Sequence, residues 1–169
     1  MKLSAQEEYG LRCLLHLARC SDGQSLTIPE ISRAEGLSVP NVAKLMRLLR
    51  LGGLVQSARG QSGGYTLSKP ANQISVAEVV YLLGGPLFGP AFCERHSGKA
   101  RVCPRARDCS LRSLWSSAQS LLDGILRRTS LADLLCDEGA MARRIEQLSR
   151  AMAPVAAGAG QLVSVRDQA

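Results

Sequence analysis

Two capped helices followed at once by a β-hairpin constrain the fold of this chain more than any other feature. Residues 27–30, Thr-Ile-Pro-Glu, form a capping box with proline in the first helical turn, and Gly36 ends the helix. A second helix is expected from Ser38 to the glycine pair at 52–53. Two helices joined by a short turn that contains glycine are typical of a helix-turn-helix.

The hairpin makes this a winged helix. Residues 54–59 and 65–68 have strand patterns, and the glycine-rich turn 60–64 joins them. This turn is no phosphate-binding loop, because neither Gly-Lys-Ser/Thr nor a following helix is present. A helix from Ser4 to about Arg19 precedes the motif, and another from Ser75 to Leu83 follows it. Cys13 and Cys20, on or near the first helix, are expected to be small buried residues.

The charge distribution favours DNA as the partner. The chain has a net charge of +7, and residues 36–77 contain no Asp or Glu but five Lys and Arg. Arg59 lies beside the glycine-rich turn, where few side chains would block its approach to DNA. An arginine in such a position can insert into the minor groove. The expected DNA contacts, from the second helix of the motif and the wing, are Ser38, Asn41, Lys44, Arg47, Arg59 and Gln61.

Three of the six cysteines, Cys93, Cys103 and Cys109, lie in a polar, basic stretch without helical or strand periodicity. The start of the chain has no apolar signal region and no run is long enough to span a membrane, so the expected compartment is the cytoplasm, where disulfides are rare. We interpret the stretch as a metal site, with an iron–sulfur cluster favoured. Zinc held with His96 and cluster-free thiol sensing are the alternatives.

A long amphipathic helix is expected after the cysteines. Its apolar positions follow the i, i+3, i+4, i+7 rule over residues 111–125. Reading of a palindromic operator generally needs two-fold symmetry, so we assign the helix to a homodimer interface, with packing inside one chain as the alternative. The expected interface residues are Leu111, Leu114, Trp115, Ala118, Leu122 and Ile125.

The predicted architecture is mainly α with a small β-hairpin wing. A winged helix-turn-helix domain covers 1–85, a cysteine-rich loop 86–109, and a dimerisation helix with C-terminal helices 110–150. A short helix is expected from Ser130 with Cys136 buried, and another over 141–148. The low-complexity tail 151–169 is expected to be disordered.

The sequence also resembles a known family, on three sets of residues. Met1-Lys2-Leu3-Ser4 with Tyr9 and residues 11–15, the wing Arg-Gly-Gln-Ser-Gly-Gly-Tyr at 59–65, and Ser-Leu-Ala-Asp-Leu at 130–134 are similar to Rrf-type bacterial transcription factors. That family includes the iron–sulfur regulator IscR, the nitric-oxide sensor NsrR and the cysteine-metabolism regulator CymR. The likeness implies a dimeric winged-helix regulator whose DNA affinity depends on a bound cluster.

The resemblance assigns cluster ligation to Cys93, Cys103 and Cys109, and leaves [2Fe-2S] and [4Fe-4S] open. Arg112 stands where IscR has a ligand histidine, and it cannot ligate because it stays protonated. NsrR-like members take a carboxylate from the first helix of the partner subunit, which implies Glu8 as the fourth ligand. The competitors are Glu7, His96, Asp108 and a small molecule. Ala43 replaces a base-reading Glu of IscR, which implies a different operator.

We therefore expect a DNA-binding regulator, more specifically a repressor, whose cluster senses redox state, nitric oxide or iron status. The chain has no nucleophile–base constellation, so we expect no enzymatic activity. An electron-transfer protein is a further alternative, but the wing and the basic helix oppose it.

Overall fold

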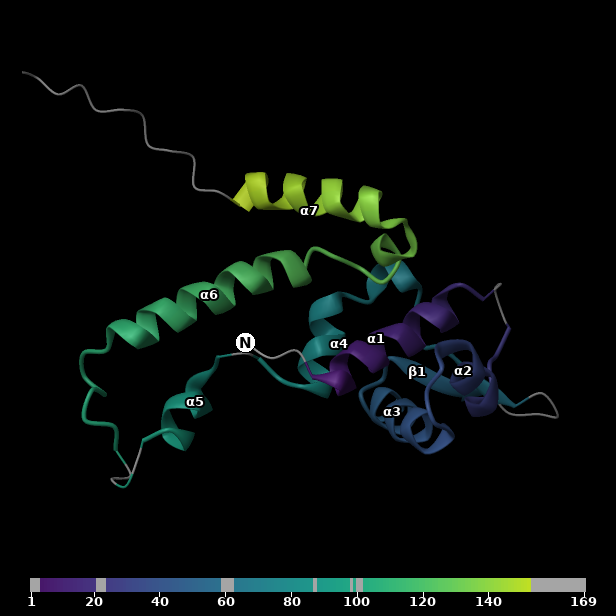
Figure 1. Ribbon diagram of the computed structural model, residues 1–169, viewed down its shortest axis with the longest axis horizontal. Helices are drawn as coiled ribbons and strands as arrows, with labels where there is room; N and C mark the ends of the chain where they lie inside the picture. The colour runs from purple at the N-terminus through teal and green to yellow at the C-terminus, as the bar shows by residue number, and fades with distance from the viewer. Residues whose placement is uncertain are drawn as a thin grey trace, which may run out of the picture.

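The computed structural model describes residues 4–20, 24–58, 63–86, 88–97, 99 and 102–152 of the 169-residue chain. The described N-terminal part is a winged helix-turn-helix (Figure 1). Its elements are α1 (Ala5–Ala18), α2 (Ile28–Glu35), α3 (Val39–Leu51), β1 (Val55–Ala58), β2 (Gly64–Leu67), the 3₁₀ turn η1 (Ala71–Gln73) and α4 (Val76–Leu83). The two strands pair antiparallel, from Val55 opposite Leu67 to Ala58 opposite Gly64. The predicted wing is confirmed, and the loop at its tip, residues 59–62, lies outside the described residues.

Local signals set the ends of these helices as predicted. Capping boxes are present at Ser4, Thr27 and Ser75, each with a glutamate three residues later. Gly36 ends α2 in the left-handed conformation, with φ of 65°, which a residue with a side chain rarely adopts. The turn between α2 and α3 is therefore fixed by the sequence at this point.

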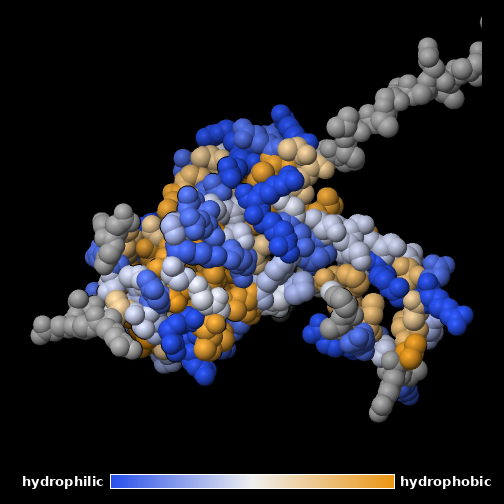
Figure 2. Space-filling view, turned by 180° about the vertical axis from the view of Figure 1, so that it is seen from behind, coloured by the Kyte–Doolittle hydropathy of each residue, from blue (hydrophilic) through white to orange (hydrophobic). Residues whose placement is uncertain are grey.

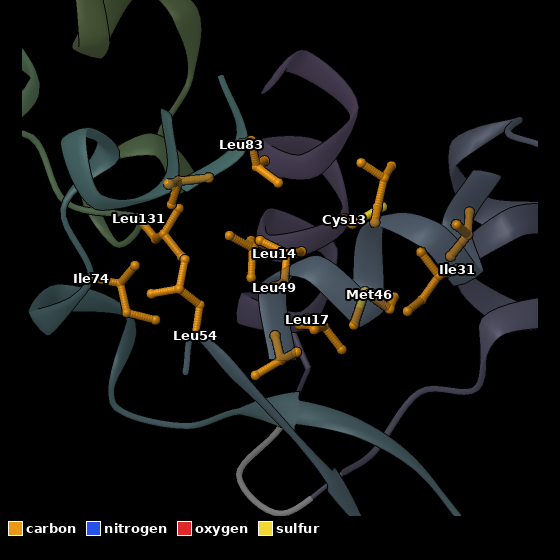
Figure 3. Close-up of a cluster of buried hydrophobic side chains, with 14 of the residues drawn as sticks. Cys13, Leu14, Leu17, Ile31, Met46, Leu49, Leu54, Ile74, Leu83 and Leu131 are labelled. Atoms are coloured by element: carbon orange, nitrogen blue, oxygen red, sulfur yellow. The ribbon is translucent and has the colours of Figure 1, made fainter. Parts of the chain in front are cut away.

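Aliphatic side chains from every helix of the motif fill a single core (Figure 3). Leu14 of α1 and Leu49 of α3 are completely buried, and Ile74 and Leu131, from segments far apart in the sequence, lie together beside them. Cys13 belongs to this core, and burial raises the pKa of its thiol to about 11. The prediction of a buried small residue is confirmed for Cys13 and wrong for Cys20, which is only half-buried at the end of α1.

The C-terminal helices form a limb that projects from this body (Figure 1). The limb comprises α5 (Pro90–Arg95), α6 (Ser110–Leu126), the 3₁₀ turn η2 (Asp133–Leu135) and α7 (Glu138–Met152). After α6 the chain returns to the core, where the Val76 amide donates to the Thr129 carbonyl at 2.8 Å and the Leu131 amide to the Ile74 carbonyl at 2.9 Å. This short antiparallel pairing attaches the root of the limb to the winged-helix domain.

Three predictions about the C-terminal half are wrong in part. The cysteine stretch is not wholly irregular: α5 begins with Pro90 after Gly89, and Phe92 packs on Phe88 at a ring distance of 5.2 Å. Cys136 is exposed rather than buried, because the segment after Ser130 forms only a 3₁₀ turn. The last helix is longer than predicted and reaches Met152. The rest of the expected tail, 153–169, lies outside the described residues.

We expect a small acid-dependent loss of stability at Glu78. The hydrogen bond from the Lys69 ammonium at 2.7 Å, and then that from the Ser75 amide at 2.8 Å, lower the pKa of this carboxyl below its ordinary value. A carboxyl with a lowered folded-state pKa stabilises the fold above its unfolded pKa, and this contribution disappears as the pH falls through the folded value.

The variant Glu78→Gln keeps a residue type that serves a capping box and removes only the charge. We expect it to lower the free energy of unfolding by less than about 1 kcal/mol at neutral pH, because the pair is partly exposed. Denaturant unfolding at several pH values measures this difference. It should disappear as the pH falls through the lowered folded-state pKa of Glu78; a constant difference across the range would assign the effect to packing.

Candidate nucleic-acid interface and cysteine loop

The exposed side of α3 carries the residues predicted to contact DNA. Ser38 at its N-cap, Lys44 and Arg47 are exposed, and Asn41 is half-buried. The opposite side packs its apolar residues into the core, so the polar side chains face solvent as a recognition helix requires. Arg59 and Gln61, the predicted wing contacts, lie outside the described residues.

An ion-pair network attaches α2 to α1 and so holds the helix-turn-helix in place. The Arg12 guanidinium donates to the Glu35 carboxylate at 2.9 Å and to the Glu35 carbonyl at 2.6 Å. His16 Nδ1 lies 3.5 Å from the other carboxylate oxygen of Glu35. His16 of α1 therefore contacts α2 through Glu35.

The three loop cysteines come from different local structures. Cys93 lies in α5, Cys103 in the following turn, and Cys109 is the N-cap residue of α6. All three are half-buried free thiols. Among the described residues no three His, Cys, Asp or Glu side chains lie close enough together to hold a metal ion. A single chain in this conformation thus places the predicted ligands on one limb without bringing them together.

The four side chains proposed as the fourth ligand differ in their exposure and in the contacts that they already make. Glu7 is buried in the capping box of α1, with its carboxylate on the Ser4 amide at 2.8 Å, whereas its neighbour Glu8 is exposed. The His96 ring stacks on Phe92, and its Nδ1 lies 2.7 Å from the Phe92 carbonyl. Asp108 is exposed.

Arg112, where the family resemblance implied a ligand histidine, has a structural contact instead. Its guanidinium donates to the Ala106 carbonyl at 2.7 Å, which links the first turn of α6 to the segment between Cys103 and Cys109. The Cys109 carbonyl also accepts hydrogen bonds from the Arg112 and Ser113 amides. The position of Cys109 is consequently coupled to the start of α6.

The apolar stripe of α6 is not covered by the described part of the chain. Leu111, Leu114, Trp115 and Leu121 are among the most exposed large hydrophobic residues of the described structure, and no residue of α6 is buried. Viewed from behind, hydrophobic residues reach the surface along the projecting limb (Figure 2). The other predicted interface residues, Ala118, Leu122 and Ile125, are half-buried. Packing among the described residues therefore does not account for the stripe.

A polar cluster that was not predicted joins α6 to α4. Gln119 donates to the Tyr81 hydroxyl at 3.0 Å and to the Asp123 carboxylate at 2.6 Å, and the Tyr81 hydroxyl bonds Asp123 as well. The Gln119 side-chain oxygen accepts from the Phe88 amide at 2.9 Å. The only sequence signal was two polar residues four positions apart on one side of an amphipathic helix.

Comparison with known proteins agrees with this arrangement. Residues 3–137 match the family Rrf2, described as an iron-dependent transcriptional regulator. The chain belongs to the Rrf2 family.

Similar proteins include regulators named IscR and the global cysteine regulator CymR. The chain is 36% identical over 137 residues to the protein rrf2 of Nitratidesulfovibrio vulgaris, covering 81% of this chain and 89% of that protein. It is 30% identical to the regulator IscR of Cronobacter sakazakii, covering 80% of each. The structure of CymR, the global cysteine regulator of B. subtilis, has 27% identity and a TM-score of 0.65, covering 80% of this chain and 96% of that one.

These findings establish a DNA-binding transcriptional regulator with a winged-helix fold, from a family that is not enzymatic. The predicted family, fold and absence of an enzyme are confirmed. No helix in the described part of this Rrf2-family chain is long and apolar enough to cross a membrane.

We expect Arg47→Ala to weaken binding to the chain's own promoter DNA by roughly 1–3 kcal/mol, because the exposed guanidinium of α3 is placed to contact a base or a phosphate. Fluorescence anisotropy with labelled promoter DNA measures the loss. Arg150→Ala, which removes an exposed arginine paired with Glu146 on α7, should leave affinity unchanged. Equal affinities of Arg47→Ala and wild type would contradict the assignment of α3.

Proposed function

We propose that this regulator is a homodimeric repressor whose operator affinity is set by an iron–sulfur cluster held by Cys93, Cys103 and Cys109. The observation that carries the proposal is the place of Cys109. It is the N-cap of the helix whose apolar stripe is exposed, and the other two thiols lie in the segment directly before it.

The donor set fits such a cluster chemically. Three thiolates are the preferred ligands of iron–sulfur clusters, and none of these thiols is in a disulfide. Because they are not gathered in the single chain, ligation requires the loop to close and α5 to become fixed against the start of α6. A bound cluster supplies redox and ligand-exchange chemistry that a thiol loop alone lacks. Whether it is [2Fe-2S] or [4Fe-4S] stays open.

Contacts of the described residues connect this loop to the DNA-reading helix. The Cys109 carbonyl holds the first turn of α6, and the cluster Tyr81, Gln119 and Asp123 joins α6 to α4. Next to Tyr81, Leu82 lies so close to α3 that a Cβ on Gly52 would come within 2.1 Å of it. A conformational change in the loop can therefore be transmitted through these contacts to the C-terminal end of α3.

The exposed apolar stripe of α6 supports the homodimer. At about 100° per residue, Leu114 lies on the opposite side of α6 from Gln119 and Asp123, which face α4. Leu121 is closer to α7, because it lines the same hollow as Gly124 and Met152. A second copy of the same helix offers a matching apolar surface. Two recognition helices related in this way suit a palindromic operator with half-sites about 34 Å apart.

For the fourth ligand we retain Glu8 of the partner subunit. Glu8 is exposed in the first turn of α1, whereas Glu7 is used by its own helix cap. A carboxylate oxygen is a harder and more exchangeable ligand to iron than a thiolate, which suits a sensor.

Cluster-free thiol sensing is the second candidate function. It is favoured by the separation of the three thiols in the chain and by the structural likeness to CymR, the B. subtilis cysteine regulator. A zinc site would use the same thiols with His96, whose Nδ1 contact with the Phe92 carbonyl leaves Nε2 as the coordinating atom.

Elemental analysis of protein purified without oxygen separates these three functions. We expect iron and acid-labile sulfide, a brown colour, and visible absorbance that changes on exposure to oxygen or nitric oxide. Stoichiometric zinc would support the zinc site instead. Metal-free protein that still changes its operator affinity on thiol oxidation would establish thiol sensing.

A further inference from the structure

Three arginines converge on one pocket at the root of the limb. The pocket has a volume of about 490 Å³, and its lining includes Asn72, Gln73, Arg127, Arg128, Asp133 and Arg144. These residues come from η1, the end of α6, η2 and α7, so four segments contribute. Three arginines and one aspartate give the lining a charge of +2.

Asp133 is the one acidic residue in the pocket lining, and its carboxylate oxygen nearest Arg144 already accepts three hydrogen bonds. Asp133 Oδ2 accepts from the Ser130 amide, the Ser130 hydroxyl and Arg144 Nη2, each at 2.8 Å. Partial burial alone would raise the pKa of Asp133, but the bonds from Ser130 and the nearby Arg144 lower it below its ordinary value. Asp133 thus orients Arg144 and remains charged.

The arginines keep donors available for a ligand. Arg144 Nε is the only buried side-chain nitrogen or oxygen in the described part of the chain without a hydrogen-bond partner. Arg127 is held with its guanidinium carbon 5.5 Å from the centre of the Tyr81 ring, and Arg128 contacts Arg144 through its carbonyl rather than its guanidinium. A buried donor without a partner is costly, and a bound anion would remove this cost.

We propose that this pocket binds a phosphate group, as inorganic phosphate or as the phosphoryl group of a small metabolite. Guanidinium groups bind phosphate oxygens through paired, charge-assisted hydrogen bonds, and two of these arginines are held in place before a ligand arrives. DNA phosphate is the less suitable source, because α7 lies on the far side of α1 and α4 from α3 (Figure 1). The site does not depend on a cluster.

Calorimetric titration of the full chain with inorganic phosphate, and separately with glycerol phosphate, tests this proposal. We expect saturable binding that the same ionic strength of sodium chloride does not reproduce. In proton–nitrogen NMR spectra the Nε–H resonance of Arg144 should shift with the same saturation curve. Saturation by only one of the two probes would identify the free or the esterified phosphate as the ligand.

Two variants and a matched control make the test specific. Arg128→Gln and Arg144→Gln should each weaken phosphate binding at least about tenfold, and Arg143→Gln, an exposed neighbour on α7 outside the pocket, should not. If circular dichroism shows that Arg144→Gln disturbs α7, Arg128→Gln decides. No saturable binding, or equal losses in all three variants, overturns the proposal. So does a loss of promoter affinity in Arg128→Gln without phosphate binding, which would assign the pocket to DNA.

Discussion

Leu114→Asp should convert the proposed homodimer to a monomer and reduce its operator affinity about a hundredfold. The Leu114 side chain is 56% exposed in the single chain and lies within the apolar stripe of α6. In a symmetric interface the substitution buries two unpaired carboxylates, each of which costs several kcal/mol. Size-exclusion chromatography with light scattering measures the mass, and fluorescence anisotropy measures binding to the operator.

Ser113→Asp provides the matched control for this experiment. It places the same charge on the preceding residue of the same helix, about 100° away from Leu114 and outside the stripe. We expect it to remain dimeric and to bind operator normally. A dimeric Leu114→Asp protein with unchanged promoter affinity would show that the stripe does not form the interface.

Cys109→Ser should abolish cluster binding. A serine hydroxyl is a much poorer ligand for iron than a thiolate, and the other two thiols cannot hold the cluster with the fourth ligand alone. Protein purified without oxygen should lose nearly all its iron, sulfide and visible absorbance. In wild type we expect the operator affinities of the cluster-loaded and cluster-free forms to differ by roughly 5- to 150-fold, and the variant should give one affinity under both conditions.

Cys136→Ser is the control for this experiment, because it removes a thiol that is not a proposed cluster ligand. Cys136 is exposed outside the loop, and its thiol donates only to the Asp133 carbonyl at 3.0 Å. The variant should keep its iron and its absorbance. Cys109→Ser protein with full iron content would rule out Cys109 as a ligand. If Cys109→Ser and Cys136→Ser both lost their iron, the loss would indicate a general effect on folding.

The helix-turn-helix was predictable because its signals are local. A capping box at Thr27, the left-handed Gly36 and the glycine pair after Leu51 each act within one or two turns, so the sequence alone placed α2 and α3. The same holds for the wing and for the burial of Cys13. The short α5 was missed, because it is too short to show periodicity and its aromatic contacts join Phe88, Phe92 and His96.

Sequence by itself determined a winged helix with an acid-free reading surface, an amphipathic helix after it, and three cysteines between the two. Only the tertiary structure decided that the apolar stripe of α6 is left uncovered and that Tyr81 meets Gln119 and Asp123. It also brought Arg127, Arg128 and Arg144 to one pocket and kept the cysteine thiols apart. The physical reason is that hydropathy periods and capping residues act between near neighbours. Contacts between side chains from distant segments depend instead on how the helices pack.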